Sequence, residues 1–125
     1  MKFNHDIVRK LMLEMENSEH ITGLNEAELL AFAKNNNITR DELIYTLIKM
    51  YEGGFITNPV NYETNKIIWI PEEALTKQGH DFLDTIRDNR VWSATKKKAS
   101  TIKDASLEVL KDIATQVAVD LIKGN

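Results

Sequence analysis

The stretch that decides the fold is TRDELIYTLIKMYEGGFI, residues 39–56, in which a helical pattern runs into two glycines. Thr39 and Glu42 have the spacing of a capping box, in which each side chain bonds the other residue's backbone amide. Apolar residues then recur at helical spacing, namely Ile44, Leu47, Ile48 and Tyr51. A glycine supplies the left-handed residue that ends many helices. The sequence therefore predicts a helix that begins after Thr39 and ends at Gly53-Gly54.

The residues after the glycine pair change to the pattern of strands. Two short runs, 55–57 and 66–70, are rich in β-branched and aromatic residues, which favour strands. A polar connection with turn residues, 58–65, separates them. We therefore predict a two-stranded antiparallel hairpin over residues 55–70, directly after the helix.

Two amphipathic helices are predicted ahead of residue 39. Asn4 can cap the first, over residues 4–16, because an asparagine side chain accepts from the free amides of a first turn. Asn25 and Glu28 repeat the capping-box spacing at the start of the second. Three asparagines at 35–37 end that helix, since they favour turns. The second and third helices are thus joined by a short turn, as in a helix-turn-helix.

Helices are predicted again after the hairpin. Thr76 is placed to cap one of them, in which Gly79 marks a close approach of two backbones, and helical spacing continues to about residue 101. A last helix is expected over about 105–123. The predicted fold is mainly α with a small β-hairpin: a winged helix-turn-helix, residues 1–88, with a C-terminal helical extension, residues 89–125, in a single domain.

Composition limits the classes of function. With 125 residues the chain has the length of one domain, and zero Cys excludes a disulfide framework, a Cys-ligated zinc site and a thiol nucleophile. No apolar run approaches the ~18 residues of a membrane span, and the start of the chain is unlike a signal peptide. We therefore expect a cytoplasmic protein that does not enter membranes.

The candidate nucleic-acid contacts are few. The net charge is −3, which argues mildly against a dedicated DNA-binding protein, because neutralising phosphates supplies most of the affinity for DNA. In a helix-turn-helix the outer face of the third helix reads the major groove. The candidate contacts there and in the one dense basic run are Arg40, Tyr45, Lys49, Lys96, Lys97 and Lys98. The alternative is that both segments are solvated helix faces, and acidic Asp41 and Glu42 support that alternative on the third helix.

The last helix carries a continuous apolar stripe. Four of its residues, Leu110, Ile113, Val117 and Leu121, are spaced so that they share one face. We expect them to be buried, either in the core of the monomer or across the axis of a homodimer. Trp69 and Trp92 are expected to be core anchors.

No motif in the sequence carries a reaction. There is no Gly-rich phosphate loop and no nucleophile motif. His80 and Asp84 stand four residues apart on a predicted helix, but metal sites need more ligands at defined spacing, so we assign them to packing or hydrogen bonding. We predict no catalytic residue, no cofactor and no metal.

Three segments resemble one family, catalogued as domain of unknown function 2513 and found in bacteria, phages and mobile elements. They are Met1-Lys2 with Asn4–Arg9, then Gly79–Asp84 with Ile86–Asp88 and Val91-Trp92, and finally Ser106–Lys111, which is similar to the family's last helix. The resemblance implies a mobile-element origin and a winged-helix-like core, and it implies no activity. The expected function is that of a non-enzymatic DNA-binding or regulatory protein of a phage or mobile element. The alternative is a module that binds or inhibits a host or phage protein, for which an acidic surface is no handicap.

Overall fold

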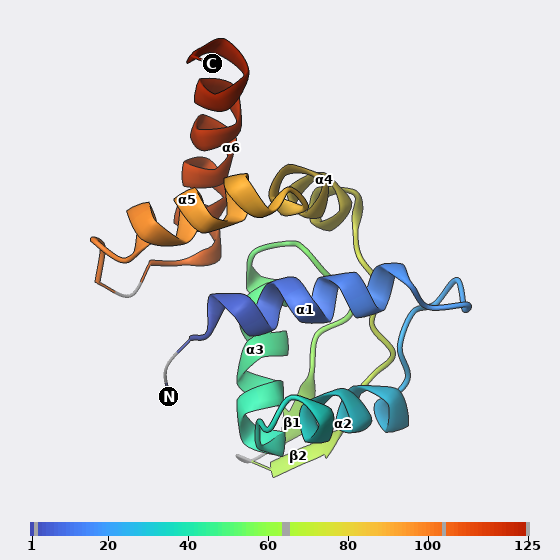
Figure 1. Cartoon of the computed structure of the whole chain (residues 1–125). Coiled ribbons are helices and arrows are strands. Elements are labelled where there is room, and N and C mark those ends of the chain that lie inside the picture. The colour runs from blue at the N-terminus through green and yellow to red at the C-terminus, as the bar shows by residue number, and fades with distance from the viewer. Residues whose placement is uncertain (2, 64–65, 104, 125) are drawn as a thin grey trace.

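The computed structural model describes residues 1, 3–63, 66–103 and 105–124, and their side chains outside 62–68. These residues form six helices and one short hairpin (Figure 1). The elements are α1 (His5–Glu16), α2 (Glu26–Asn35), α3 (Arg40–Glu52), β1 (Asn61–Glu63), β2 (Lys66–Trp69), α4 (Lys77–Ile86), α5 (Asn89–Ala99) and α6 (Leu107–Gly124). The prediction of a mainly helical chain is confirmed.

The predicted helix starts are confirmed by their caps. The Asn4 side chain accepts from the amides of Asp6 and Ile7 at the start of α1. The α3 box is complete, because the Glu42 amide donates to Thr39 Oγ1 at 3.0 Å and the Thr39 amide donates to Glu42 Oε1 at 2.8 Å. The same box, formed by Asn25 and Glu28, opens α2.

The first four helices share one core. α1 contacts α3 and α4, and α2 contacts α3. Leucines from the four helices lie fully buried at the centre of these contacts: Leu11, Leu29, Leu47 and Leu83. Burying such a side chain stabilises the fold by roughly 1.5–3 kcal/mol. Phe55 joins this core by stacking on Phe82, with ring centroids 5.0 Å apart.

The hairpin differs from the prediction. β1 pairs with β2 in antiparallel register, Asn61 opposite Trp69 and Glu63 opposite Lys66. The predicted first strand, residues 55–57, is wrong, because its backbone pairs with residues 74–76 instead. Ile56 forms a bridge with Leu75, and the Thr76 amide donates to the Phe55 carbonyl at 3.0 Å. Residues 74–76, just before α4, therefore pair with the backbone that the prediction assigned to the hairpin.

The C-terminal helices pack on one another. α5 and α6 run against each other, and α4 contacts both of them. The predicted continuous helical pattern to residue 101 is broken at Asp88, whose side chain caps a separate α5 by accepting from Arg90 and Val91. The far end of α6 projects beyond the body of the molecule (Figure 1). No helix in the described part of the chain is long and apolar enough to cross a membrane.

The stripe on α6 is mostly used inside the monomer. Leu110 and Val117 are buried without any second copy, whereas Ile113 and Leu121 are half-buried. The expected burial is thus confirmed for the first pair and is partial for the second.

The two tryptophans have different surroundings. Trp92 is 4% exposed and is a core anchor as predicted. Trp69 is 46% exposed at the end of β2, so its assignment to the core is wrong. Its neighbour Ile70 is 3% exposed instead, because successive side chains of an extended segment point to opposite faces.

Candidate binding site on helix α3

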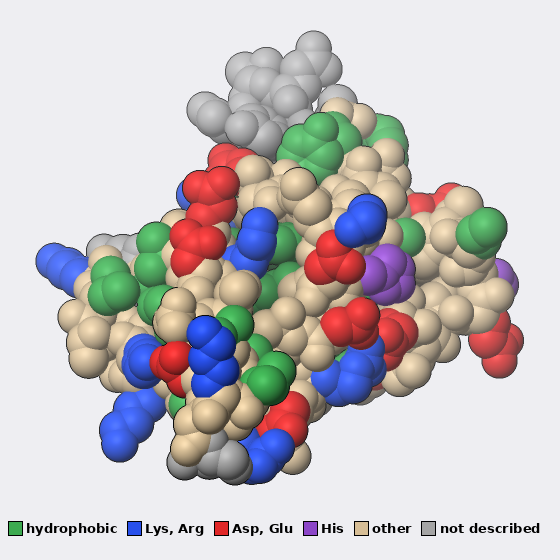
Figure 2. Space-filling model, turned by 90° about the horizontal axis from the view of Figure 1, so that it is seen from above, with side chains coloured by type: hydrophobic (Ala, Val, Ile, Leu, Met, Phe, Trp, Pro, Cys, Tyr) green, Lys and Arg blue, Asp and Glu red, His purple; other side chains and the backbone are tan. Residues whose placement is uncertain are grey.

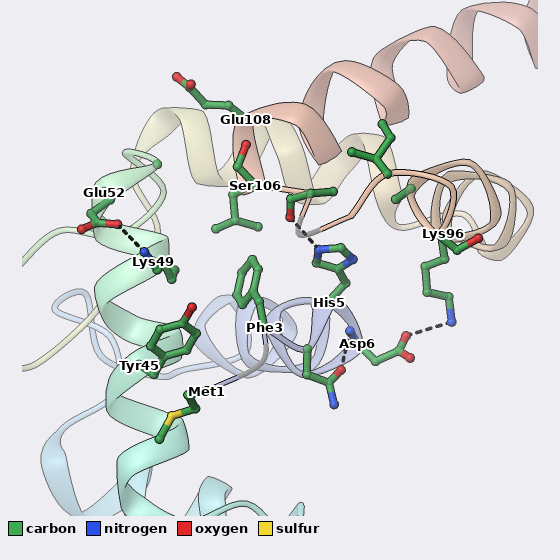
Figure 3. Close-up of a pocket in the computed structure, with 17 residues that line it drawn as sticks. Met1, Phe3, His5, Asp6, Tyr45, Lys49, Glu52, Lys96, Ser106 and Glu108 are labelled. Atoms are coloured by element: carbon green, nitrogen blue, oxygen red, sulfur yellow. Dashed lines mark hydrogen bonds and ion pairs between the residues drawn. The ribbon is translucent and has the colours of Figure 1, made fainter.

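A hollow of about 1030 Å³ lies between the outer face of α3, the start of α1 and the connection from α5 to α6. We call it the α3 hollow. Figure 3 shows the side chains around it. Those that matter here are Met1, Phe3, His5, Asp6, Tyr45, Lys49, Glu52, Lys96, Ile102, Ser106 and Glu108.

The α3 side of the hollow is formed by three residues in helical spacing. Tyr45, Lys49 and Glu52 stand four and three residues apart, so they share one face of the helix. Lys49 Nζ lies 3.3 Å from Glu52 Oε1 and 5.5 Å from the centroid of the Tyr45 ring. The lysine is therefore held by an ion pair and a cation–π contact on its own helix.

The start of the chain forms the floor of the hollow. The Phe3 ring lies edge-on to His5, at 5.2 Å between centroids, and edge-on to Tyr45, at 6.5 Å. His5 Nε2 lies 3.2 Å from the carbonyl oxygen of Ala105, to which it can donate. Figure 3 shows Phe3 between Tyr45 and His5. These contacts join residues 3–5 to α3 on one side and to the α5–α6 connection on the other.

Lys96 of α5 forms the third side of the hollow, and Asp6 at the start of α1 holds it in place. Asp6 Oδ1 accepts from Lys96 Nζ at 2.9 Å and from the buried Trp92 Nε1 at 3.0 Å. Burial raises the pKa of Asp6, but the hydrogen bonds from Lys96 and Trp92 outweigh it, and the pKa lies below its usual value. Asp6 therefore stays ionised at neutral pH, and it binds the start of α1 to α5.

A second contact of α1 reinforces this arrangement. Arg9 Nε donates to the carbonyl of Ile86 at 3.1 Å, and its Nη2 donates to the carbonyl of Arg87 at 2.8 Å. The guanidinium lies 5.8 Å from the Trp92 ring centroid. Arg9 thus satisfies backbone carbonyls at the end of α4 and packs against Trp92 of α5. These contacts fix the connection between α4 and α5 against α1.

The hollow suits binding more than chemistry. Its charged residues include two lysines, and each is paired with a carboxylate, Lys49 with Glu52 and Lys96 with Asp6. Apolar surface lies beside these pairs, since Met1 and Ile102 are 66% and 44% exposed. Among the described residues no three His, Asp or Glu side chains are grouped to hold a metal ion. The arrangement offers shape, apolar contact and polar anchors.

The structure brings together only some of the predicted nucleic-acid contacts. Tyr45, Lys49 and Lys96 line the hollow, although they come from two helices. Arg40 is exposed at the other end of α3, and Lys97 and Lys98 are exposed on α5 outside the hollow. On the face seen in Figure 2, Lys and Arg side chains are interspersed with Asp and Glu. The six residues therefore do not form one basic surface.

Sequence reasoning missed the residues that the start of the chain and the connection between α5 and α6 contribute to the hollow. Phe3, His5, Ile102 and Ser106 were not among the predicted site residues. The only sequence signal was the position of Phe3 just before the Asn4 cap, where an apolar residue often packs near the first turn. His80 and Asp84, assigned to packing or hydrogen bonding, are exposed, and Asp84 accepts from Arg87 at 2.9 Å.

Comparisons with known proteins give a family and a relative. A family model described as hypothetical protein (DUF2513) matches residues 2–106. An uncharacterized protein of Haemophilus influenzae is 28% identical over 123 residues, which are 98% of this chain and 96% of that protein. No solved structure matches the chain. The family match ends at residue 106, so the similarity of residues 106–111 to the family's last helix stays a prediction.

Proposed function

The chain belongs to the DUF2513 family, and from the surface that it builds we propose a non-enzymatic regulatory protein that binds a segment of another protein in the α3 hollow. The first three helices and the hairpin then work as a winged-helix-like scaffold that presents this hollow. The proposed setting is the cytoplasm of a cell that carries a phage or mobile element, as the family resemblance implies.

The observation that carries the proposal is the state of the outer face of α3. Tyr45 and Lys49 are half-buried, and Phe3 lies against Tyr45, so the face is one wall of a concave site. A helix that reads DNA presents its outer face freely, because its side chains must reach base edges in the major groove. A partner polypeptide requires no such projection and fits a hollow of this size.

Charge supports the same choice. The charged side chains on the exposed part of α3 are Arg40, Asp41, Glu42, Lys49 and Glu52, which is three acids against two bases. A helix face with more acidic than basic side chains is not attracted to the phosphates that line a DNA groove, since phosphate contacts favour Lys and Arg. Contacts between proteins commonly combine such mixed charges with aromatic and apolar anchors.

A second candidate function is DNA binding through α5. Lys97 and Lys98 are exposed in the last turn of that helix, and the described residues place no carboxylate in an ion pair with either. Lys103 follows in the exposed connection. These lysines are free to contact phosphates, and they lie outside the hollow.

The test is a pull-down from host lysate with the full chain as bait, with and without nuclease. We expect a protein partner that survives nuclease treatment and is lost with Tyr45→Ala. The matched control is Tyr51→Ala, because Tyr51 is exposed on the same helix and does not line the hollow. A partner that is lost with nuclease, or with Lys97→Ala and Lys98→Ala instead, contradicts the hollow and favours DNA. Circular dichroism of each variant verifies that it is folded.

A further inference from the structure

Glu73 is a buried carboxyl group outside the hollow. Its side chain is fully buried, in the connection between β2 and α4. Oε1 accepts from the Asn58 amide at 2.9 Å and from Thr57 Oγ1 at 3.4 Å. Oε2 is buried and has no hydrogen-bond partner. A buried oxygen without a partner is costly, and the cost is much larger when the group is ionised.

The backbone of Glu73 is held in place independently of its side chain. The Glu73 amide donates to the Leu24 carbonyl at 2.9 Å, and the Leu24 amide donates back at 2.8 Å. Gly23 allows this close approach, because a Cβ at that position would lie 1.9 Å from the Glu73 carbonyl oxygen. The side chain of Glu73 therefore extends to residues 57–58 from a backbone that these hydrogen bonds hold in place.

Two carboxyl groups hold the two ends of the segment that contains the hairpin. Glu73 holds the segment where it begins, at Asn58. Glu26, in the first turn of α2, holds it where it ends, because its Oε2 accepts from the Ile70 amide at 2.9 Å. The two supports differ in one respect: Glu26 is only half-buried, whereas Glu73 has no access to water.

We propose that Glu73 is a proton-dependent latch: its uncharged carboxyl group holds the first end of the hairpin segment, and its ionisation releases that end. Release removes the buried charge from the interior and frees the Asn58 amide to bond water. The hairpin then keeps its own strand pairing, its attachment at Ile70 and the hydrogen bond from Asn58 Nδ2 to the Glu72 carbonyl, but the Asn58 amide is no longer held by Glu73.

The surroundings supply no charge that would stabilise ionised Glu73. Among the described side chains, the titratable residues on the neighbouring segments are His20 in the loop before Gly23, Glu26 and Glu28 on α2, Glu72 beside it, and Lys77 on α4. Lys77 pairs with Asp81 at 2.8 Å, and none of the described residues forms an ion pair with Glu73. Three of these residues are acidic, so they cannot compensate a negative charge on Glu73.

The expected pH range follows from the difference between the two states. Burial raises the pKa of Glu73 to about 8 from an ordinary value of 4.5, and the hydrogen bonds from Asn58 and Thr57 only partly offset this. The latched state therefore binds the proton more tightly than the released state. Between these two values the ratio of released to latched molecules rises by about tenfold for each pH unit, and above pH 8 it is constant.

The experiment is NMR on the full chain between pH 5 and pH 9. The carboxyl carbon of Glu73 reports its titration, and amide hydrogen exchange reports opening at Asn58. Exchange is expressed as a protection factor, which removes the intrinsic effect of pH on the exchange rate. The amide of Leu11, in the centre of α1, serves as the reference for global unfolding. Glu73→Gln is the test variant, and Glu72→Gln, an exposed neighbour, is the matched control.

We expect Glu73 to titrate near pH 8 and the protection of Asn58 to fall by about tenfold per pH unit up to that point. Global unfolding also exposes Glu73, so the protection of Leu11 should fall with the same slope but stay well above that of Asn58 at every pH. The pH dependence should vanish in Glu73→Gln and persist in Glu72→Gln. Titration of Glu73 near its ordinary value of 4.5, or equal protection factors at Asn58 and Leu11, overturns the latch, because equal factors mean that Asn58 opens only when the whole protein unfolds. The titration of Glu73 and the amide exchange of Asn58 and Leu11, both measured on the wild-type chain, test the latch even if Glu73→Gln does not fold.

Discussion

Gly79 lies in the first turn of α4, directly against the carbonyl group of Phe55. A Cβ at this position would lie 2.2 Å from that oxygen and 3.1 Å from its carbon. The obstacle is backbone, which Thr76 also holds through its amide hydrogen bond to the same carbonyl, so it cannot move aside cheaply. Because Gly79 has no side chain, the backbone just before α4, residues 74–76, can pair with residues 55–57.

We predict that Gly79→Ala destabilises the protein by about 1–3 kcal/mol, because the added methyl group forces the two backbones apart. The measurement is the free energy of unfolding by urea. Gly124→Ala is the matched control, since nothing lies within 4 Å of a Cβ there, and it should change stability by less than about 0.5 kcal/mol. Equal stability of the two variants would show that α4 does not depend on this close approach.

At the scale of elements, α6 shows how one helix divides its surface. Its first half supplies Leu107, Leu110 and Ala114 to the common core, while Ile122 in its last turn is 82% exposed. The apolar stripe that was compatible with a dimer seam is thus largely explained by contacts within one chain. The helix contacts α5 and α4, so its loss affects the C-terminal part of the fold first.

We predict that Leu110→Ala lowers stability by about 2–5 kcal/mol, because it leaves a cavity in a fully buried site. Ile122→Ala should leave it unchanged, because that side chain is already in water. Thermal unfolding measures both effects, and size-exclusion chromatography measures the mass. A folded Leu110→Asp, Val117→Asp double variant that elutes as a smaller species than the wild type would restore the dimer interpretation.

At the scale of the whole molecule, charge and shape decide between the candidate partners. The net charge is −3, and the lysines of the α3 hollow are paired with carboxylates. The exposed lysines at the end of α5 and in the connection after it, Lys97, Lys98 and Lys103, are too few to give high affinity for a duplex, because each phosphate contact adds a limited, salt-dependent share.

We predict that the chain does not retard duplex DNA in a gel shift at ~150 mM salt, where exposed charges are largely screened beyond about 8 Å. Weak binding at ~50 mM salt should depend on Lys97 and Lys98, and it should be unchanged by Arg40→Ala with Lys49→Ala. Binding that persists at ~150 mM salt and needs Arg40 and Lys49 would place α3 in a DNA groove.

The parts of the fold that could be predicted from sequence are those that depend on neighbours along the chain. Both capping boxes close within four residues, so their spacing is visible in the sequence. The pairing of residues 55–57 with 74–76 was not predictable, because it depends on Gly79 lying against Phe55 in space. Trp69 was assigned to the core, but the buried residue at this end of β2 is its neighbour Ile70.

The residues of the candidate site also fall into two groups: those that local sequence spacing predicts and those that depend on distant contacts. Tyr45 and Lys49 could be predicted, because helical periodicity puts them on the outer face of α3. Lys96 belongs to the same hollow only through its ion pair with Asp6, across 90 residues of sequence. Phe3 carries only the signal of its position before the Asn4 cap, and the places of Phe3 and His5 in the hollow depend on contacts with Tyr45 and Ala105. Contacts of this range are not encoded in local spacing.

The contacts of Asp6 and His5 also set an order of events during synthesis on the ribosome. The start of α1 emerges first, but its partners Trp92, Lys96 and Ala105 are made late. The core shared by α1 to α4 can therefore collapse while the hollow still lacks one wall. A nascent or prematurely terminated chain thus carries α3 without the concave surface, and only a chain translated beyond residue 105 can complete the hollow.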